Sequence, residues 1–286
     1  MNRLVLGCGY LGSRVARSWL SDGDNVYAVT RCPDNARRMK QEGMIPVIAD
    51  ITEADSVKQL PHADTILFSV GMDRKKYDSV HSVYVDGLKN VLSGISMAPS
   101  QLIYISSTGV YGNFDGAWID ENSPTDPARE GGKACLAAEK LLQSSRFAAQ
   151  STILRFAGIY GPKRVPTKAL IQSQQWKKIS ADGFLNLIHV DDGANIIQKL
   201  SDQGIVQETF NVSDGNPPKR KQYYQFVAEQ LGLTEIPWKE TKSANGNSRS
   251  GSNKRVSNKK LVRQLGDVFR YENFQSGLQQ ALASTE

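Results

Sequence analysis

Short, uninterrupted apolar runs alternate with longer amphipathic stretches along the first two-thirds of the chain. The runs predict strands, and because they are apolar on both faces they are typical of strands buried inside a parallel sheet. The predicted strands span residues 2–6, 25–30, 45–49, 64–69, 101–106 and 152–157. The predicted helices lie near residues 11–21, 34–42, 53–60, 75–97 and 134–150. This alternation predicts an α/β fold with a doubly wound parallel sheet of the Rossmann type.

The pattern becomes less regular after Gly161-Pro162. Segment 187–200 predicts a short strand or turn and then a helix that opens at Asp191-Asp192. Segment 209–213 predicts another strand. Segment 241–258 is rich in Gly, Ser and Asn and lacks periodicity, so it predicts a loop.

Two domains of different charge are expected. Residues 1–162, completed by parts of 187–213, are expected to form the sheet domain, and residues 163–286 a smaller, discontinuous C-terminal lobe. Residues 239–286 hold nine Lys and Arg against four Asp and Glu, a net of +5, out of +6 for the whole chain. This excess fits either a solvated basic surface or attraction to an anionic partner.

Composition excludes several classes of protein. Apolar residues make up 40% and charged residues 22%, which is ordinary for a globular domain and excludes fibrous and disordered classes. No apolar run is long enough for a membrane span, and the first predicted strand leaves no room for a signal peptide. Cys8, Cys32 and Cys135 form no C-x-x-C pair, and there are only three histidines. A zinc site is therefore not expected, and reduced thiols favour a cytoplasmic location.

A glycine-rich turn joins the first predicted strand to the first predicted helix. Gly7, Gly9 and Gly12 have the spacing G-x-G-x-x-G, which at this position is typical of dinucleotide sites. Gly7 would permit the tight turn, Gly9 the close approach of a diphosphate, and Gly12 close packing of helix on strand. Unpaired N–H groups at the helix start would then face the diphosphate.

The end of the second predicted strand bears on which dinucleotide binds. NAD-selective sites place a carboxylate there, whereas this chain has Thr30-Arg31. Arg31 is able to pair with a ribose 2′-phosphate, so we expect NADP to be preferred, with NAD as the alternative. Asp50, after the third strand, is expected to accept from the adenine amino group. The full set of expected cofactor-binding residues is Gly7, Gly9, Tyr10, Leu11, Gly12, Arg31, Asp50, Ser69, Val70, Gly71 and Phe156.

Several further segments resemble the extended short-chain dehydrogenase/reductase superfamily, specifically the NAD-dependent epimerase/dehydratase family. These segments are residues 106–112 (SSTGVYG), 154–162 (LRFAGIYGP), 188–192 (IHVDD), 210–212 (FNV) and 254–258 (KRVSN). The resemblance implies a Rossmann-type sheet, a pyridine dinucleotide cofactor, and a substrate lobe that takes nucleotide sugars. It also implies that Phe156 packs near the nicotinamide.

The family's Ser/Thr and Tyr-x-x-x-Lys constellation is incomplete in this chain. Ser107 matches the Ser/Thr position. Aligning the family's P-x-x-x-Y-G-x-S-K-x-x-x-E from Pro127 to Glu139 places Gly131 at the tyrosine and Cys135 at the lysine. The resemblance is therefore to an atypical subset of the family without the Tyr-x-x-x-Lys pair. The loss removes a general acid–base contribution of about 10²–10⁴-fold.

Candidate replacements for the missing pair are Tyr111, Cys135, Lys133 or a water held by Ser107. A buried, inert thiol at Cys135 and a structural role for Tyr111 are the competing interpretations. The catalytic candidates are therefore Ser107, Tyr111 and Lys133. Thr108 and Gly109 stand where dehydratases of the family carry an Asp-Glu pair, which disfavours dehydration.

Two functions remain open from the sequence. The first is an NAD(P)-dependent sugar-nucleotide epimerase- or reductase-like oxidoreductase with an atypical active site. The alternative is a non-catalytic dinucleotide-binding sensor or scaffold. Neither nucleic acid nor membrane is expected as a partner, because no aromatic residues alternate with the C-terminal basic ones. A homodimer is compatible with the sequence.

Overall fold

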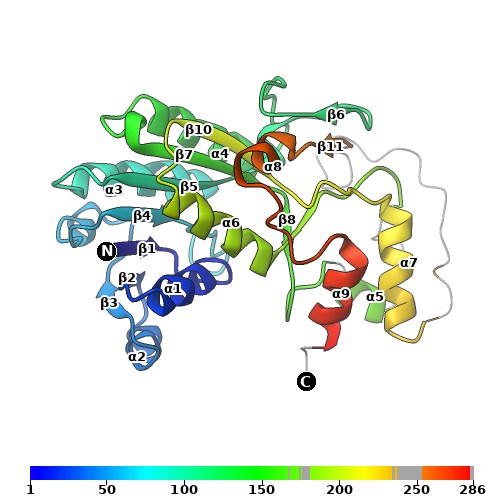
Figure 1. Cartoon of the computed structure of the whole chain (residues 1–286), viewed down its shortest axis with the longest axis horizontal. Coiled ribbons are helices and arrows are strands. Elements are labelled where there is room, and N and C mark those ends of the chain that lie inside the picture. Colours follow the sequence, from blue (N-terminus) through cyan, green and yellow to red (C-terminus); the bar gives the residue numbers. More distant parts are fainter. Residues whose placement is uncertain (167, 174, 176–180, 234–235, 237–252, 284–286) are drawn as a thin grey trace. The chain divides into compact units, whose positions relative to one another are not determined.

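The computed structural model describes residues 1–166, 168–173, 175, 181–233, 236 and 253–283. Two compact units divide the chain (Figure 1). Unit 1 comprises Met1–Val110, Glu130–Arg155 and Ala194–Phe210. Unit 2 comprises Tyr111–Arg129, Phe156–Gly193 and Asn211–Glu286. The domain boundary expected at residue 162 stays a prediction.

A seven-stranded sheet has the order β10-β7-β5-β4-β1-β2-β3 (Figure 1). Its strands are β1 (Asn2–Leu6), β2 (Asn25–Thr30), β3 (Ile45–Ile48), β4 (Thr65–Phe68), β5 (Gln101–Ser107), β7 (Ser151–Phe156) and β10 (Glu208–Val212). The pairs β1–β2, β1–β4, β2–β3 and β4–β5 are parallel, so their carboxyl ends share one edge. The order reverses at β1, which lies between β2 and β4. The predicted α/β fold with a parallel Rossmann-like sheet is confirmed.

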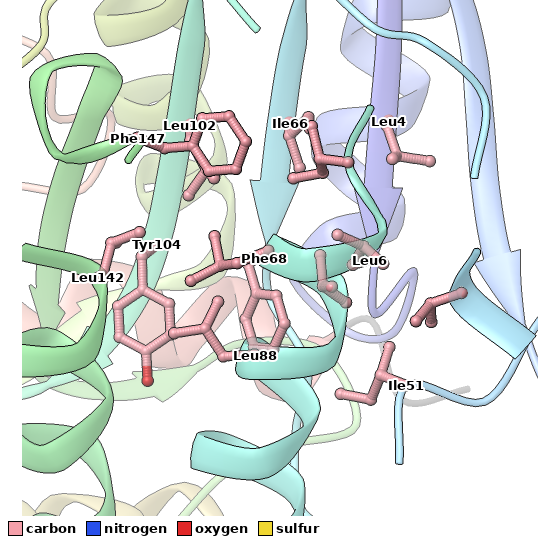
Figure 2. Close-up of a cluster of buried hydrophobic side chains, with 14 of the residues drawn as sticks. Leu4, Leu6, Ile51, Ile66, Phe68, Leu88, Leu102, Tyr104, Leu142 and Phe147 are labelled. Carbon is pink, nitrogen blue, oxygen red and sulfur yellow. The ribbon is translucent and has the colours of Figure 1, made fainter. Parts of the chain in front are cut away.

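The central strands bury side chains on both faces. Leu4, Leu6, Ile66 and Phe68 belong to one apolar cluster, while the alternate residue Val5 is equally buried on the other face. Figure 2 shows labelled members of the cluster, which are Leu4, Leu6, Ile51, Ile66, Phe68, Leu88, Leu102, Tyr104, Leu142 and Phe147. Complete burial of a large apolar side chain contributes about 1.5–3 kcal/mol, which explains why these strands read as continuous apolar runs.

The helical segments of unit 1 connect the strands. They are α1 (Gly12–Ser21), α2 (Pro33–Gln41), the 3₁₀ turn η1 (Ala54–Val57), the π-turn η2 (Ser82–Asp86), α3 (Gly87–Gly94), the 3₁₀ turn η3 (Thr108–Val110), α4 (Glu130–Gln143) and the 3₁₀ turn η4 (Ala148–Gln150). Helix α6 (Val190–Asp202) begins in unit 2 and ends in unit 1.

Unit 2 has two small parallel sheets and its own apolar cluster. Strand β6 (Trp118–Ile119) pairs with β11 (Arg255–Val256), and β8 (Gly158–Tyr160) pairs with β9 (Leu187–His189). Its remaining helices are α5 (Lys168–Gln172), α7 (Arg220–Gln230), α8 (Lys259–Leu265) and α9 (Phe274–Ala283). Tyr160, Tyr223 and Leu278 are among the side chains buried in this cluster.

The predicted strands agree with the structure to within one residue, but several helices differ. Residues 53–60 form only the short turn η1, and the helix predicted over 75–97 begins only at Val80. Before it, Lys76 and Tyr77 bond to Asp50 within unit 1. Within the predicted loop 241–258, residues 241–252 lie outside the described ones, and Arg255–Val256 form β11.

Two absences concern the described residues alone. None of their helices is long and apolar enough to cross a membrane. They also contain no group of three or more His, Cys, Asp or Glu side chains arranged to hold a metal ion.

Candidate nucleotide-binding site

The glycine-rich turn follows β1 and opens α1. Gly7 has φ of +87°, and a Cβ there would lie 2.6 Å from the backbone of Val70. A Cβ on Gly12 would lie 2.4 Å from the carbonyl oxygen of Gly7. Both positions therefore require glycine for the packing of the protein itself.

Gly9 differs from its two neighbours in the motif. A Cβ built on Gly9 meets nothing within 4 Å, and its φ does not lie in the left-handed region. Gly9 is exposed, and its backbone N–H donates to the carbonyl oxygen of Gly7 at 2.8 Å. Packing within the protein therefore does not explain the glycine at position 9, and the close approach of a diphosphate there stays a prediction.

The start of α1 carries no anion of its own. Leu11 occupies the N-cap without a side-chain hydrogen bond, and the first turn, all of it described, contains no acidic residue. Arg14 lies in this turn, where its guanidinium carbon is 4.6 Å from the ring centroid of Tyr10 and its Nη1 donates to the Tyr10 carbonyl oxygen at 2.7 Å. Helix N–H groups and a nearby cation suit an anionic ligand. Arg14 was not singled out from the sequence, although its position in the first turn was visible there.

The end of β4 is tied to the same turn. The Ser69 backbone N–H donates to the Leu6 carbonyl oxygen at 2.8 Å, and its Oγ donates to the Gly7 carbonyl oxygen at 3.0 Å. Gly71 follows, and a Cβ there would meet nothing within 4 Å. The parallel pairing of β1 and β4 thus brings Ser69 and Val70 to the glycine-rich turn, and the expectation that residues 69–71 line a cofactor stays a prediction.

Arg31 and Asp50 follow β2 and β3, and one segment contacts both. The Arg31 Nη2 lies 3.1 Å from Oδ2 of Asp73, and its guanidinium carbon lies 5.0 Å from the ring centroid of Tyr77. Asp50 Oδ2 accepts from Lys76 Nζ and from the Tyr77 hydroxyl, each at 2.6 Å. Residues 73–77, here called the DRKKY segment, therefore bridge the two residues predicted to hold the adenosine end of a dinucleotide.

The Asp50 carboxylate is stabilised in its charged form. Burial acts to raise its pKa, but hydrogen bonds from Lys76 and Tyr77 outweigh burial and hold the pKa well below its usual range. The backbone N–H and hydroxyl of Thr52 also donate to Oδ1, at 3.0 and 2.8 Å. Asp50 therefore stays an acceptor at neutral pH. The sequence did not single out the DRKKY segment, because nothing local pairs it with residues more than 20 positions away.

Ser107 lies at the end of β5 and close to α4. Its Oγ accepts from the Gly109 backbone N–H at 3.0 Å, and a Cβ on Gly109 would lie 3.9 Å from Cα of Gly132. A Cβ on Gly131 would meet nothing within 4 Å. The two segments aligned with the family's active-site motifs are thus adjacent, with open space where the family carries its tyrosine.

Two polar side chains of α4 have other surroundings. Lys133 is exposed, and its Nζ lies 2.9 Å from Oε1 of Glu130. Cys135 is buried; burial, reinforced by the charge of Glu139, raises the pKa of its thiol to about 12. A thiol with this pKa carries almost no thiolate at neutral pH.

A buried charge network holds α4 to the sheet. Oε2 of Glu139 lies 2.7 Å from Nη2 of Arg155, and the Ser106 hydroxyl donates to Oε1 of Glu139. Glu139 and Arg155 are both buried, and Arg155 comes from β7. Ser106, Glu139 and Arg155, which lie in the segments that resemble the family, therefore have a structural role, since a buried carboxylate needs such partners.

Tyr111 and Phe156 belong to unit 2. The Tyr111 hydroxyl is buried and donates to Oδ1 of Asn211 at 2.9 Å. Phe156 is also buried. The Tyr111 hydroxyl is therefore committed to a structural hydrogen bond, and the roles of both residues toward a ligand stay predictions.

Unit 2 also contains three cations, Lys254 and Arg220, which are buried, and Arg129, which is exposed, that the sequence did not single out individually. Lys254 is buried, and its Nζ donates to the carbonyl oxygens of Tyr111 and Gly112 at 3.2 and 3.1 Å. Burial, together with the charges of Arg220 and Arg129, lowers the pKa of Lys254 to about 8. Repulsion from the two arginines thus adds to burial in disfavouring the charged form of Lys254.

Comparison with protein families now identifies the chain's relatives. Residues 3–213, well over half of the chain, match the model of the NAD dependent epimerase/dehydratase family. The chain belongs to this family.

Individual relatives span nearly the whole chain. A provisionally assigned NAD-dependent epimerase/dehydratase from Methylobacillus flagellatus is 30% identical, with a TM-score of 0.75 over 99% of this chain and 98% of that one. MoeE5 in complex with UDP-glucose and NAD is 21% identical, with a TM-score of 0.80 over 99% and 98% of the two chains. The sterol-4-alpha-carboxylate 3-dehydrogenase of Dictyostelium discoideum is 22% identical over 81% of this chain and 76% of its own length.

Proposed function

We propose that the chain is an NAD(P)-dependent oxidoreductase or isomerase of the epimerase/dehydratase family that acts on a nucleotide sugar. The observation that carries this proposal is Gly9, a glycine that the protein's own packing does not require, at an uncapped helix start. Backbone N–H groups there would hold the diphosphate, with Arg14 adding positive charge. When bound, the nicotinamide supplies hydride transfer.

The chain's own residues would divide the remaining tasks. Arg31 would pair with a ribose 2′-phosphate, which is the basis for proposing NADP over NAD, and Asp50 would accept from the adenine amino group. Ser107 would donate to the reacting oxygen of the substrate. Proton transfer would pass through a water at the open space beside Gly131, since Cys135 is protonated at neutral pH. The active site would thus work without the Tyr-x-x-x-Lys pair.

The nucleotide-sugar class is supported by charge in unit 2 and by one relative. The cations Lys254, Arg220 and Arg129 suit a substrate diphosphate. MoeE5, of similar fold, binds UDP-glucose together with NAD.

Gly9→Ala tests the cofactor site. Because its Cβ enters open space, we expect an unchanged melting temperature without nucleotide and about tenfold or greater loss of NADPH affinity, from loss of a charge-assisted contact worth about 1.5–3 kcal/mol. Calorimetric titration with NADPH and NADH measures the loss, and Ser21→Ala at the far end of α1 is the control. Equal affinities of wild type and Gly9→Ala would contradict the diphosphate assignment.

The second candidate is a dinucleotide-binding protein without catalysis. It is favoured by Gly131 and Cys135 at the family's tyrosine and lysine positions and by the exposed Lys133–Glu130 pair. Absorbance of the reduced nicotinamide, followed with a panel of sugar nucleotides, separates the two. Turnover that Ser107→Ala lowers by at least about 10²-fold supports the enzyme; nucleotide binding with no turnover across the panel supports the sensor.

A further inference from the structure

The DRKKY segment places a carboxylate, that of Asp73, beside the end of β2, which has no acidic residue of its own. The end of β2 carries Thr30-Arg31 instead of the acid of NAD-selective sites. Asp73, 42 positions further along the chain, brings its Oδ2 to 3.1 Å from Nη2 of Arg31. Both side chains remain partly accessible, at 35% for Arg31 and 42% for Asp73. A negative group therefore lies on the cation that a 2′-phosphate would need.

The segment is anchored from both sides. The Tyr77 ring packs against the apolar cluster of unit 1 and lies under the Arg31 guanidinium, while its hydroxyl donates to Asp50. Lys76 adds its ion pair to Asp50 at 2.6 Å. Since Asp50 is nearly buried, these contacts hold Asp73 beside Arg31 rather than leaving the pair to two mobile surface chains.

The two oxygens of Asp73 accept hydrogen bonds from the kinds of donor that also bind a phosphate. Oδ2 accepts from Arg31, and Oδ1 accepts from the backbone N–H of Lys75 at 3.1 Å. These two hydrogen bonds keep the carboxylate ionised, and accordingly its pKa is lowered. The charges of Arg31 and Lys75 act in the same direction.

We propose that Asp73 is a selectivity residue of the cofactor site, which occupies the Arg31 guanidinium and has to leave it before a ribose 2′-phosphate binds there. This inference rests on the proposed role of Arg31. A carboxylate and a phosphate cannot both neutralise one guanidinium face, and their mutual repulsion opposes binding of the phosphate. Asp73 thus weakens NADP(H) binding and leaves NAD(H), which has no 2′-phosphate, almost unaffected.

Asp73→Asn tests this with a minimal change. An asparagine keeps Oδ1 as acceptor for Lys75 and replaces the charged Oδ2, which accepts from Arg31, by an NH2 group that does not accept from a guanidinium. The exposed Asp78 in the same region provides Asp78→Asn as a matched loss of one negative charge. Dissociation constants for NADPH and NADH are measured by calorimetry for wild type, both variants, Arg31→Ala and the Arg31→Ala/Asp73→Asn double variant.

The expected result is NADPH affinity raised about three- to tenfold by Asp73→Asn, with NADH affinity within twofold of wild type and Asp78→Asn without effect. In the double variant the gain is absent, because no guanidinium remains to be released. Unchanged NADPH affinity in Asp73→Asn, while Arg31→Ala weakens NADPH binding, overturns the proposal and leaves the proposed function standing.

Two other outcomes are informative. Weakened NADH binding with unchanged NADPH binding in Asp73→Asn would mean that Asp73 accepts from the ribose hydroxyl, and it overturns the competition. Absence of binding of either nucleotide to wild type removes both the proposed function and this inference.

Discussion

Replacement of Asp214 by asparagine should remove a pH-dependent loss of stability in unit 2. Asp214 follows β10, and its Oδ1 accepts from the Asn216 backbone N–H at 3.0 Å. Its Oδ2 is buried and, among the residues the structure describes, has no hydrogen-bond partner. Burial, opposed by the Asn216 hydrogen bond and reinforced by the charge of Asp192, raises the pKa of Asp214 to about 7.

The sign and size of the effect follow from linkage. The folded-state pKa exceeds the unfolded value of 3.8, so the folded state binds the proton more tightly. Stability is therefore full below about pH 4, falls as the pH rises toward 7, and is lowest above it. A rise from 3.8 to about 7 corresponds to about 4 kcal/mol at 1.4 kcal/mol per unit of pKa.

Urea denaturation followed by tryptophan fluorescence at pH 5.5 and pH 8.5 measures this difference. Wild type should lose about 2 kcal/mol between the two pH values relative to Asp214→Asn, because only the roughly 1.5 pH units between pH 5.5 and the folded-state pKa contribute. Asp214→Asn has no charge to bury and keeps the Asn216 hydrogen bond. Asp267→Asn is the control, because the exposed Asp267 accepts from the backbone N–H two residues on in the same way. If Asp214→Asn and wild type show the same change with pH, the argument from burial is wrong.

Three further variants or reactions have defined outcomes. Gly12→Ala should lower the melting temperature and the unfolding free energy by about 2–3 kcal/mol, because its Cβ would lie 2.4 Å from the Gly7 carbonyl oxygen; stability equal to wild type would refute this close approach. Glu139→Gln should cost about 3 kcal/mol in urea denaturation, since Arg155 would keep a buried charge without its carboxylate, and a loss below 1 kcal/mol would contradict the buried pair. Cys135 should resist iodoacetamide at pH 8 in the folded protein and react in urea, because its pKa in the folded protein is about 12. Mass spectrometry detects the label, and rapid labelling of the folded protein would contradict this prediction by showing an accessible thiolate.

Local patterns predicted the sheet and the glycine-rich turn correctly. Strands such as Leu4-Val5-Leu6 are buried on both faces, and burial on both faces requires consecutive apolar residues, which the sequence shows directly. The spacing of Gly7 and Gly12 indicated the turn, although the backbone that excludes a Cβ at Gly7 belongs to Ser69 and Val70, far away in the sequence. Helix starts were less predictable, since Lys76 and Tyr77 bond to Asp50, which is distant in the sequence, and the helix begins only at Val80.

For the candidate site, too, the sequence predicted the features that depend on residue type and on position after a strand. The sequence predicted Arg31, Asp50 and Ser107 from their places after strands, because parallel strands bring their carboxyl ends to one edge. The absence of the Tyr-x-x-x-Lys pair, inferred from the alignment of Gly131 and Cys135 with the family's motif, stays a prediction.

Long-range pairing was beyond the reach of the sequence. Three features depend on side chains that the fold brings together from distant positions. Asp73 contacts Arg31, and Tyr77 contacts both Arg31 and Asp50. Asp214 has a buried oxygen without a donor among the described residues. Residue type and spacing predict secondary structure because the interactions that favour a helix or a strand act between residues that are close in the sequence. Charge pairing and desolvation depend on which surfaces the completed fold brings into contact, and only three-dimensional packing decides that.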